Sequence, residues 1–221
     1  LASVTYGGAS AAGVAVSGTA LAMTLAFPSG AFATNDLVLL QVYVRNPNVS
    51  LASAPTSFTS LYADDMATGR QYILYKFSSA TAETGSISLS FANTTSSVKI
   101  ARAYRFKDVD PVSFVEGASF GAGTARSITD TRVVTSGPNR LALQLIGCSE
   151  PRTMGPFTGG GMSGGTWTEP VAEYTMASGM LALQIGTMTT SRSMDGGTYT
   201  FSNPAPMWGN RGLALIPNCK T

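Results

Sequence analysis

The stretch that decides the fold is Val98-Lys-Ile-Ala-Arg-Ala-Tyr-Arg-Phe106, which leads into Lys107-Asp-Val-Asp-Pro111. Apolar residues alternate with lysine and arginine in its first part, which is typical of a strand with one face toward solvent. Pro111 ends this strand, because proline fixes φ and favours an extended conformation in the residue before it. One set of expected strands precedes this turn, and a second set that looks like a variation on the first follows it. We therefore expect two halves of one β-sandwich that meet here.

The composition fits a single large all-β domain. The chain has 221 residues, of which 12% are charged, against about 25% in ordinary globular domains. So few charges indicate a surface that is partly covered by neighbouring molecules, because sparse surface charge otherwise weakens solubility. We expect one β-sandwich domain over residues 1–221, with N-terminal strands in 1–34, a first half over 35–111 and a second half over 112–221.

Before the turn, the apolar pattern predicts several strands. Leu37–Val44 is a nearly continuous apolar run, which favours a central strand buried on both faces. Ile87, Leu89 and Phe91 alternate with serines, which indicates one buried and one exposed face. The sequence from Ala63 to Gly69 reads as a loop. The expected strands are Leu21–Phe27, Leu37–Val44, Phe58–Tyr62, Arg70–Phe77 and Ile87–Phe91.

After the turn, similar patterns return in the same order. The tetrad Leu-Ala-Leu-Gln occurs at Leu141–Gln144 and again at Leu181–Gln184. The predicted fold is therefore an all-β, jelly-roll-like antiparallel β-sandwich with two quasi-repeated halves. The alternative, that any two halves of a β-sandwich look alike at this level, stays open. The expected strands are Val112–Phe120, Ile128–Val134, Leu141–Cys148, Met180–Ile185, Thr198–Phe201 and Leu213–Ile216, and the basic residues Lys99 and Arg211 lie near the starts of the two closing strands.

Charge and hydropathy exclude two classes of partner. The net charge is +2 and no basic stripe is present, so we expect no nucleic-acid binding. The longest apolar run, around Leu37–Val44, falls far short of the roughly 20 residues that span a bilayer, and the chain does not open on a secretory signal. We therefore expect no membrane span. Because position 1 is leucine, we expect that a preceding segment has been cleaved, trimmed or left out.

The chain contains no histidine. This absence excludes Ser-His-Asp and Cys-His catalysis, and it excludes zinc held by histidine. Cys148 and Cys219 are too few for a disulfide scaffold. Two separate thiols in a protein assembled in a reducing cytoplasm are the favoured interpretation, and a Cys148–Cys219 disulfide is the alternative.

Carboxylates are the remaining candidates for chemistry. Paired carboxylates could hydrolyse glycosides, and the candidates are Glu169 with Glu173, Glu150, and Asp64-Asp65. Asp64-Asp65 and Asp108-Val-Asp110 have the hardness for calcium but lack the number of ligands of a recognised calcium loop. Solvated surface carboxylates are the commoner interpretation, so we expect a non-enzymatic protein without a metal or another cofactor.

Candidate contact residues are aromatic or lie in the glycine-rich segment Pro151–Gly165. Such a segment loses much entropy when it is fixed, so we expect an exposed loop that becomes ordered only against a partner. Trp208 lies in the expected loop Pro204–Asn210. A sugar-stacking platform of aromatic side chains is one interpretation, and a core position for Trp167, equivalent to Phe58, is the other. The candidates are Trp208, Tyr62, Phe157, Met162 and Trp167.

Several strings resemble a β-sandwich module of virion structural proteins from tailed phages and prophages. They are Asn35-Asp-Leu-Val-Leu-Leu40, Phe58-Thr59, Tyr72-Ile-Leu-Tyr-Lys76, Ala103–Pro111 and Gly212-Leu-Ala-Leu-Ile-Pro217. The resemblance covers about residues 35–217 and implies a capsid decoration, a head fibre or a tail appendage, with no catalytic residues. This sequence differs from the family in lacking an obvious shaft or coiled-coil anchor.

From this resemblance we expect a non-enzymatic structural protein on the virion surface, assembled in the host cytoplasm. Its expected partners are a major capsid or appendage protein and further copies of itself in a homo-oligomer. The alternative function is a carbohydrate- or receptor-binding adhesin module that attaches the virion to host surface glycans.

Overall fold

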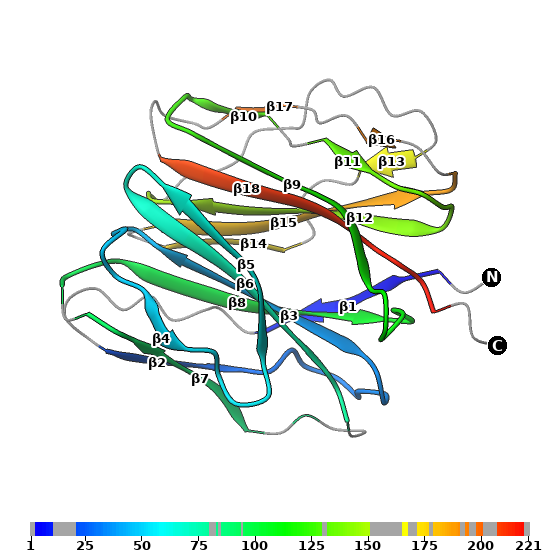
Figure 1. Cartoon of the computed structure of the whole chain (residues 1–221), viewed down its shortest axis with the longest axis horizontal. Coiled ribbons are helices and arrows are strands. Elements are labelled where there is room, and N and C mark those ends of the chain that lie inside the picture. The colour runs from blue at the N-terminus through cyan, green and yellow to red at the C-terminus, as the bar shows by residue number, and fades with distance from the viewer. Residues whose placement is uncertain are drawn as a thin grey trace.

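A computed structural model describes residues 3–10, 21–79, 83, 85–93, 95–129, 132–150, 165–167, 172–176, 179–190, 193–194, 198–200 and 207–218. All regular elements in these segments are strands, and every strand pairing is antiparallel. The prediction of an all-β antiparallel sandwich is confirmed (Figure 1).

The first main sheet has the strand order β1-β8-β3-β6-β5. Its centre is β3, the apolar run predicted from the sequence, and all eight of its residues are buried. A strand buried on both faces can be apolar throughout, because both faces are covered by other layers. The strands are β1 (Thr5–Ala9), β8 (Lys99–Lys107), β3 (Leu37–Val44), β6 (Gly69–Phe77) and β5 (Thr59–Met66).

A smaller sheet, β2-β7-β4, covers one face of the first main sheet. Its strands are β2 (Ala22–Ala26), β7 (Ser86–Phe91) and β4 (Leu51–Ser53). In β7, Ile87, Leu89 and Phe91 are buried while the serines between them are exposed, as the alternation predicts. These side chains pack on Val38, Leu40 and their neighbours in a shared apolar cluster.

The second main sheet has the order β13-β15-β12-β18-β9, and β14 also pairs with β15. Its strands are β13 (Gly165–Trp167), β15 (Gly179–Met188), β12 (Arg140–Cys148), β18 (Trp208–Leu215), β9 (Val115–Gly123) and β14 (Ala172–Met176). Two short pairs complete this half: β10 (Ser127–Thr129) with β17 (Thr198–Thr200), and β11 (Val133–Val134) with β16 (Ser193–Met194). Apolar clusters join both pairs to this sheet through Ile128 and Val133.

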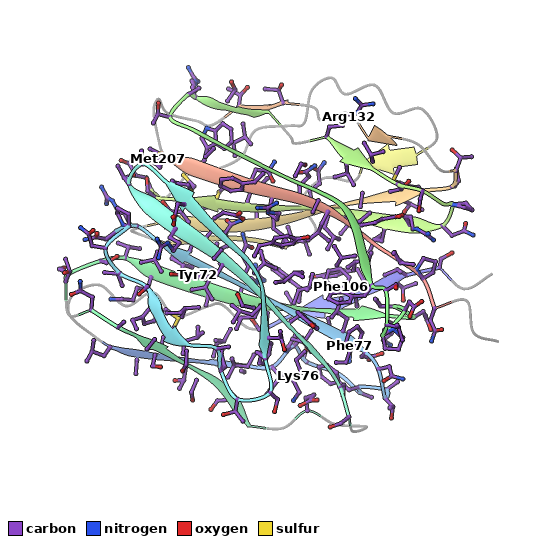
Figure 2. The ribbon with its side chains drawn as sticks, viewed as in Figure 1. Tyr72, Lys76, Phe77, Phe106, Arg132 and Met207 are labelled. Atoms are coloured by element: carbon purple, nitrogen blue, oxygen red, sulfur yellow. The ribbon has the colours of Figure 1, made fainter. Side chains whose placement is uncertain are left out.

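The two main sheets pack face to face. Their shared core takes alternate residues from the central strands, such as Leu37 and Leu39 from β3 and Leu141 and Leu143 from β12. Figure 2 shows Phe106 among the side chains that fill the space between the sheets. The molecule therefore has four layers, because each main sheet is covered on its other face by smaller sheets.

The strand orders of the halves match. Strands β5-β6-β3-β8-β1 of the first sheet correspond in sequence order and pairing to β13-β15-β12-β18-β9 of the second. If the halves are aligned so that Leu37 matches Leu141, then Gln41 matches Leu145. Within its own sheet, Gln41 pairs with Arg102, and Leu145 pairs with Arg211. The sequence had suggested that Arg211 corresponds to Lys99. The register shows that it corresponds to Arg102.

The jelly-roll prediction is not settled by this topology. A jelly roll pairs its fifth strand with the fourth, whereas here β5 pairs with β6 across the two-residue turn at Ala67-Thr68. The jelly-roll description therefore stays a prediction.

Several predicted boundaries were wrong. Asp64 and Asp65 lie inside β5 and not in a loop, and Val112 precedes β9, which begins at Val115. The expected strand over Ile128–Val134 is two short strands, β10 and β11. Trp208 begins strand β18 and is only 7% exposed, so its assignment to a loop is wrong.

Gly147 in β12 allows the two main sheets to approach closely. A Cβ atom at this position would lie 2.7 Å from Gln71 Oε1 and 2.8 Å from Tyr43 Cδ2, both buried in the first sheet.

We predict that Gly147→Ala lowers the free energy of unfolding by about 1–3 kcal/mol, as overpacking does in a close-packed core. Urea unfolding measures this change. Ser90→Ala, at an exposed position of β7, is the control and should change stability by less than about 0.5 kcal/mol. Equal stability of the Gly147 variant and the original chain would contradict the prediction.

Candidate functional site

A buried ion pair joins the two main sheets. Arg211 Nε of β18 donates to Asp64 Oδ2 of β5 at 2.9 Å, and a second bond joins the guanidinium to Asp64 Oδ1. The side chains are 11% and 8% exposed. The guanidinium carbon lies 4.3 Å from the ring centroid of Tyr62 and 5.2 Å from that of Phe120. Asp64, a candidate acid in the sequence, therefore works as the partner of an arginine from the other half.

Tyr62 is half-buried beside this ion pair. Burial raises the pKa of its phenol, the positive charge of Arg211 lowers it, and the negative charge of Asp64 raises it further. Its ring packs against Arg211 between the sheets, so its most direct partner is inside the molecule.

A chain of amide hydrogen bonds runs between the same sheets. Tyr104 Oη donates to Gln41 Oε1 at 3.0 Å, Gln41 Nε2 donates to Gln71 Oε1 at 3.3 Å, and Gln71 Nε2 donates to the Leu145 carbonyl at 3.1 Å. The three side chains are buried or nearly so. Burial is the main cause that raises the pKa of Tyr104 well above its ordinary value. This chain fixes the lateral position of one sheet on the other, because buried polar groups are costly to leave unpaired.

Glu116 holds a second ion pair, at the start of the second half. It accepts from Arg140 Nε at 2.6 Å and from Ser136 Oγ at 2.5 Å. Burial raises the pKa of the carboxyl, but the hydrogen bonds from Ser136 and Arg140 outweigh it, so the pKa is below 4.5. The ionised form of Glu116 is therefore favoured in the folded protein.

We predict that Glu116→Gln lowers stability only where the carboxylate is ionised. A carboxyl with a depressed pKa stabilises the fold above its unfolded value of 4.5, and this contribution is lost as the pH falls through the lower folded value. The loss at neutral pH should be about 1 kcal/mol, since the pair is partly screened by solvent. Urea unfolding of both proteins, at neutral pH and well below 4.5, measures it. A deficit of the same size at both pH values would contradict the prediction. Asp65→Asn, in a pair whose acid is 69% exposed, is the control.

A pocket of about 410 Å³ lies where three turns meet at one end of the first half. The turns are the segment after β3, the β5–β6 turn and the segment before β8. The lining residues are Arg45, Asn46, Pro47, Ala67, Thr68, Ser96, Ser97 and Val98. They include one cation, four hydroxyl or amide side chains and no acid. The volume falls in the range of small-molecule sites.

Hydrogen bonds between the turns fix the walls of this pocket. The Arg45 amide donates to the Val98 carbonyl at 2.9 Å, and Asn93 Nδ2 donates to the Asn48 carbonyl at 3.1 Å. Gly69 lets the β5–β6 turn approach β3, because a Cβ atom there would lie 2.7 Å from the Val44 carbonyl oxygen. The pocket is therefore shaped by the fold before any ligand arrives.

A buried lysine lies behind the Ser96–Val98 wall. Lys99 has no exposed surface, its Nζ lies 3.4 Å from the Ser97 carbonyl oxygen, and it lies 5.4 Å from the centroid of the Phe91 ring. Burial lowers the pKa of this amine.

Three of the five candidate contact residues, Tyr62, Trp167 and Trp208, lie in the described part of the chain. Trp208 packs in a buried cluster with Ile146, Cys148 and Met180, which does not fit the exposed contact residue we expected. Trp167 ends β13 and pairs with Gly186 of β15. Phe157, Met162, Glu169 and Cys219 lie outside the described residues, as does the segment 151–164. Cys148 is buried.

Within the described ranges there is no group of three or more acidic, cysteine or histidine residues that could hold a metal ion. Likewise, that part of the chain contains no helix long and apolar enough to cross a membrane. The sequence-based interpretation missed the pocket altogether. Its only signal was Asn46-Pro-Asn48, which indicated the end of a strand.

Comparisons of the chain with protein-family models, with curated proteins and with solved structures found no match. The resemblance to virion modules therefore depends on the residues quoted above alone, and function has to be argued from the contacts in this chain.

Proposed function

We propose that this chain is a non-enzymatic structural protein of a virion, which decorates the capsid or forms part of a surface appendage. The observation that carries the proposal is the use of its charged groups inside the fold. Asp64 pairs with Arg211, and Glu116 pairs with Arg140, and the side chains of both pairs are largely buried. In each pair the arginine links the acid to another strand, and such links stiffen the fold, as a structural protein requires.

Such a protein works by burying surface against its neighbours. The protein has four packed layers, and the Arg211–Asp64 pair and the amide chain join the two main sheets. This arrangement gives a stiff body whose loops can make contacts. A contact of about 1,600 Å² is enough for a specific, stable interface. The low fraction of charged residues, 12%, supports a surface that is partly covered in the assembly.

The test is to count copies in the particle. Particles produced from the genome that encodes this chain would be purified and their subunit stoichiometry measured by quantitative mass spectrometry, alongside native mass spectrometry of the isolated protein. Tens to hundreds of copies would support capsid decoration, and a few copies would support an appendage. A monodisperse monomer that is absent from the particles and does not bind them would refute the proposal.

The adhesin alternative keeps one of the two aromatic residues on which it relied. Trp208 is buried, whereas Tyr62 is half-buried with its ring against Arg211.

A further inference from the structure

The pocket between the three turns has the composition of a small-ligand site. It has one guanidinium, from Arg45, which is exposed, and none of the ion pairs between described residues uses it. An arginine fork matches the two oxygens of a carboxylate in a bidentate pair. Since no acid is among the described residues that line it, the pocket favours an anionic group at Arg45.

The rest of the lining indicates what carries that anionic group. The hydroxyl groups of Thr68 and Ser96 can both donate and accept hydrogen bonds, and Asn46, whose Oδ1 already accepts from the Asn48 amide, can donate through Nδ2. Pro47 and Val98 add apolar surface that a C–H face can pack against. In the described part of the chain no aromatic side chain lines the pocket, so these residues offer no stacking surface for a nucleic-acid base. A polyhydroxylated ring satisfies this lining better than a purely apolar or a planar aromatic ligand.

We propose that this pocket binds a sugar acid, that is, a saccharide unit bearing a carboxylate, with Arg45 paired to the carboxylate. The side chains of Asn46, Thr68 and Ser96 hydrogen-bond the ring hydroxyls. The hydrogen bonds between the turns hold these groups in place, which reduces the entropy lost on binding. This site is independent of the structural role, because it lies on the surface and uses none of the residues that join the sheets.

The test is a titration of the complete chain with D-glucuronate and with D-glucose, followed by isothermal calorimetry and ligand-observed NMR. Glucuronate should bind at least about tenfold more tightly than glucose, because a charge-assisted bidentate pair is worth that much. Arg45→Ala should remove this preference, and Arg45→Lys should restore only part of it since lysine keeps the charge but not the fork.

Arg132→Ala is the matched control. It also removes one exposed arginine, but one beside β11 in the second half (Figure 2), whereas every described residue that lines the pocket belongs to the first half. It should leave glucuronate affinity unchanged. Thr68→Trp, at an exposed turn position, should block the pocket. Unchanged urea midpoints would show that the variants are folded.

Three results would overturn the proposal. The first is no binding of glucuronate at millimolar concentration, and the second is equal binding of glucuronate and glucose. The third is inorganic phosphate or sulfate binding as tightly as glucuronate, which would indicate a general anion site and not a saccharide site. Particle stoichiometry is unaffected by any of them, so a failure here is separable from a failure of the structural role.

Discussion

Arg211→Met should lower the free energy of unfolding by about 3–5 kcal/mol, which is the usual cost of removing one partner of a buried ion pair. The substitution leaves the Asp64 carboxylate between the sheets with 8% of its side chain exposed. It also removes the cation from the faces of Tyr62 and Phe120. Methionine keeps most of the side-chain volume, so the loss reports on charge and not on a cavity. Urea unfolding at neutral pH, followed by fluorescence, measures it.

Two controls separate burial from charge. Arg70→Met removes an arginine from an ion pair whose acid, Asp65, is 69% exposed, and it should cost no more than about 1 kcal/mol. The double variant Arg211→Met/Asp64→Leu removes both charges and should recover most of the loss. A loss in Arg211→Met no larger than that in Arg70→Met would show that the pair does not join the sheets.

Gln71→Leu should lower the free energy of unfolding by about 2–4 kcal/mol. It leaves the buried Gln41 Nε2 without its acceptor, at a cost of about 1–3 kcal/mol, and it removes the hydrogen bond to the Leu145 carbonyl oxygen, which is worth about 1 kcal/mol. Leucine fits the volume and is common in the surrounding core, so the loss is one of hydrogen bonding. The same unfolding assay measures it.

The multiple variant Gln41→Leu/Gln71→Leu/Tyr104→Phe tests the chain as a unit. Replacing the polar side chains together removes most unpaired groups, so it should cost less than the sum of its single variants. Strictly additive losses would show that the three side chains do not act together.

The sequence predicted the strands whose pattern is local. Leu37–Val44 became β3 and Leu141–Cys148 became most of β12, because an apolar run between turns needs only cover on both faces. The alternation in Ile87–Phe91 likewise matches its burial in β7. In each of these cases the signal and the structure lie in the same few residues.

The errors occurred where the partner is distant in the chain. The sequence pattern places Asp64 in a polar loop, but Asp64 continues strand β5. Its carboxylate accepts hydrogen bonds from Arg211, which is 147 residues away in the chain. Trp208 reads as a loop residue, but Ile128 and Met180 from two other segments enclose it. The pocket at Arg45 depends on three turns that meet only in the folded chain, so no local pattern could have revealed it.

The matching strand orders of the two halves bear on the origin of the chain. Two similar sheets that cover each other face to face are the arrangement that gene duplication and fusion of a self-associating sandwich would produce. In a homodimer, every mutation falls on both sides of the interface at once. In a fused chain the two copies can differ, and here Arg211 lies beside Asp64. Its counterpart by register, Arg102, lies instead within electrostatic reach of the phenols of Tyr6 and Tyr104.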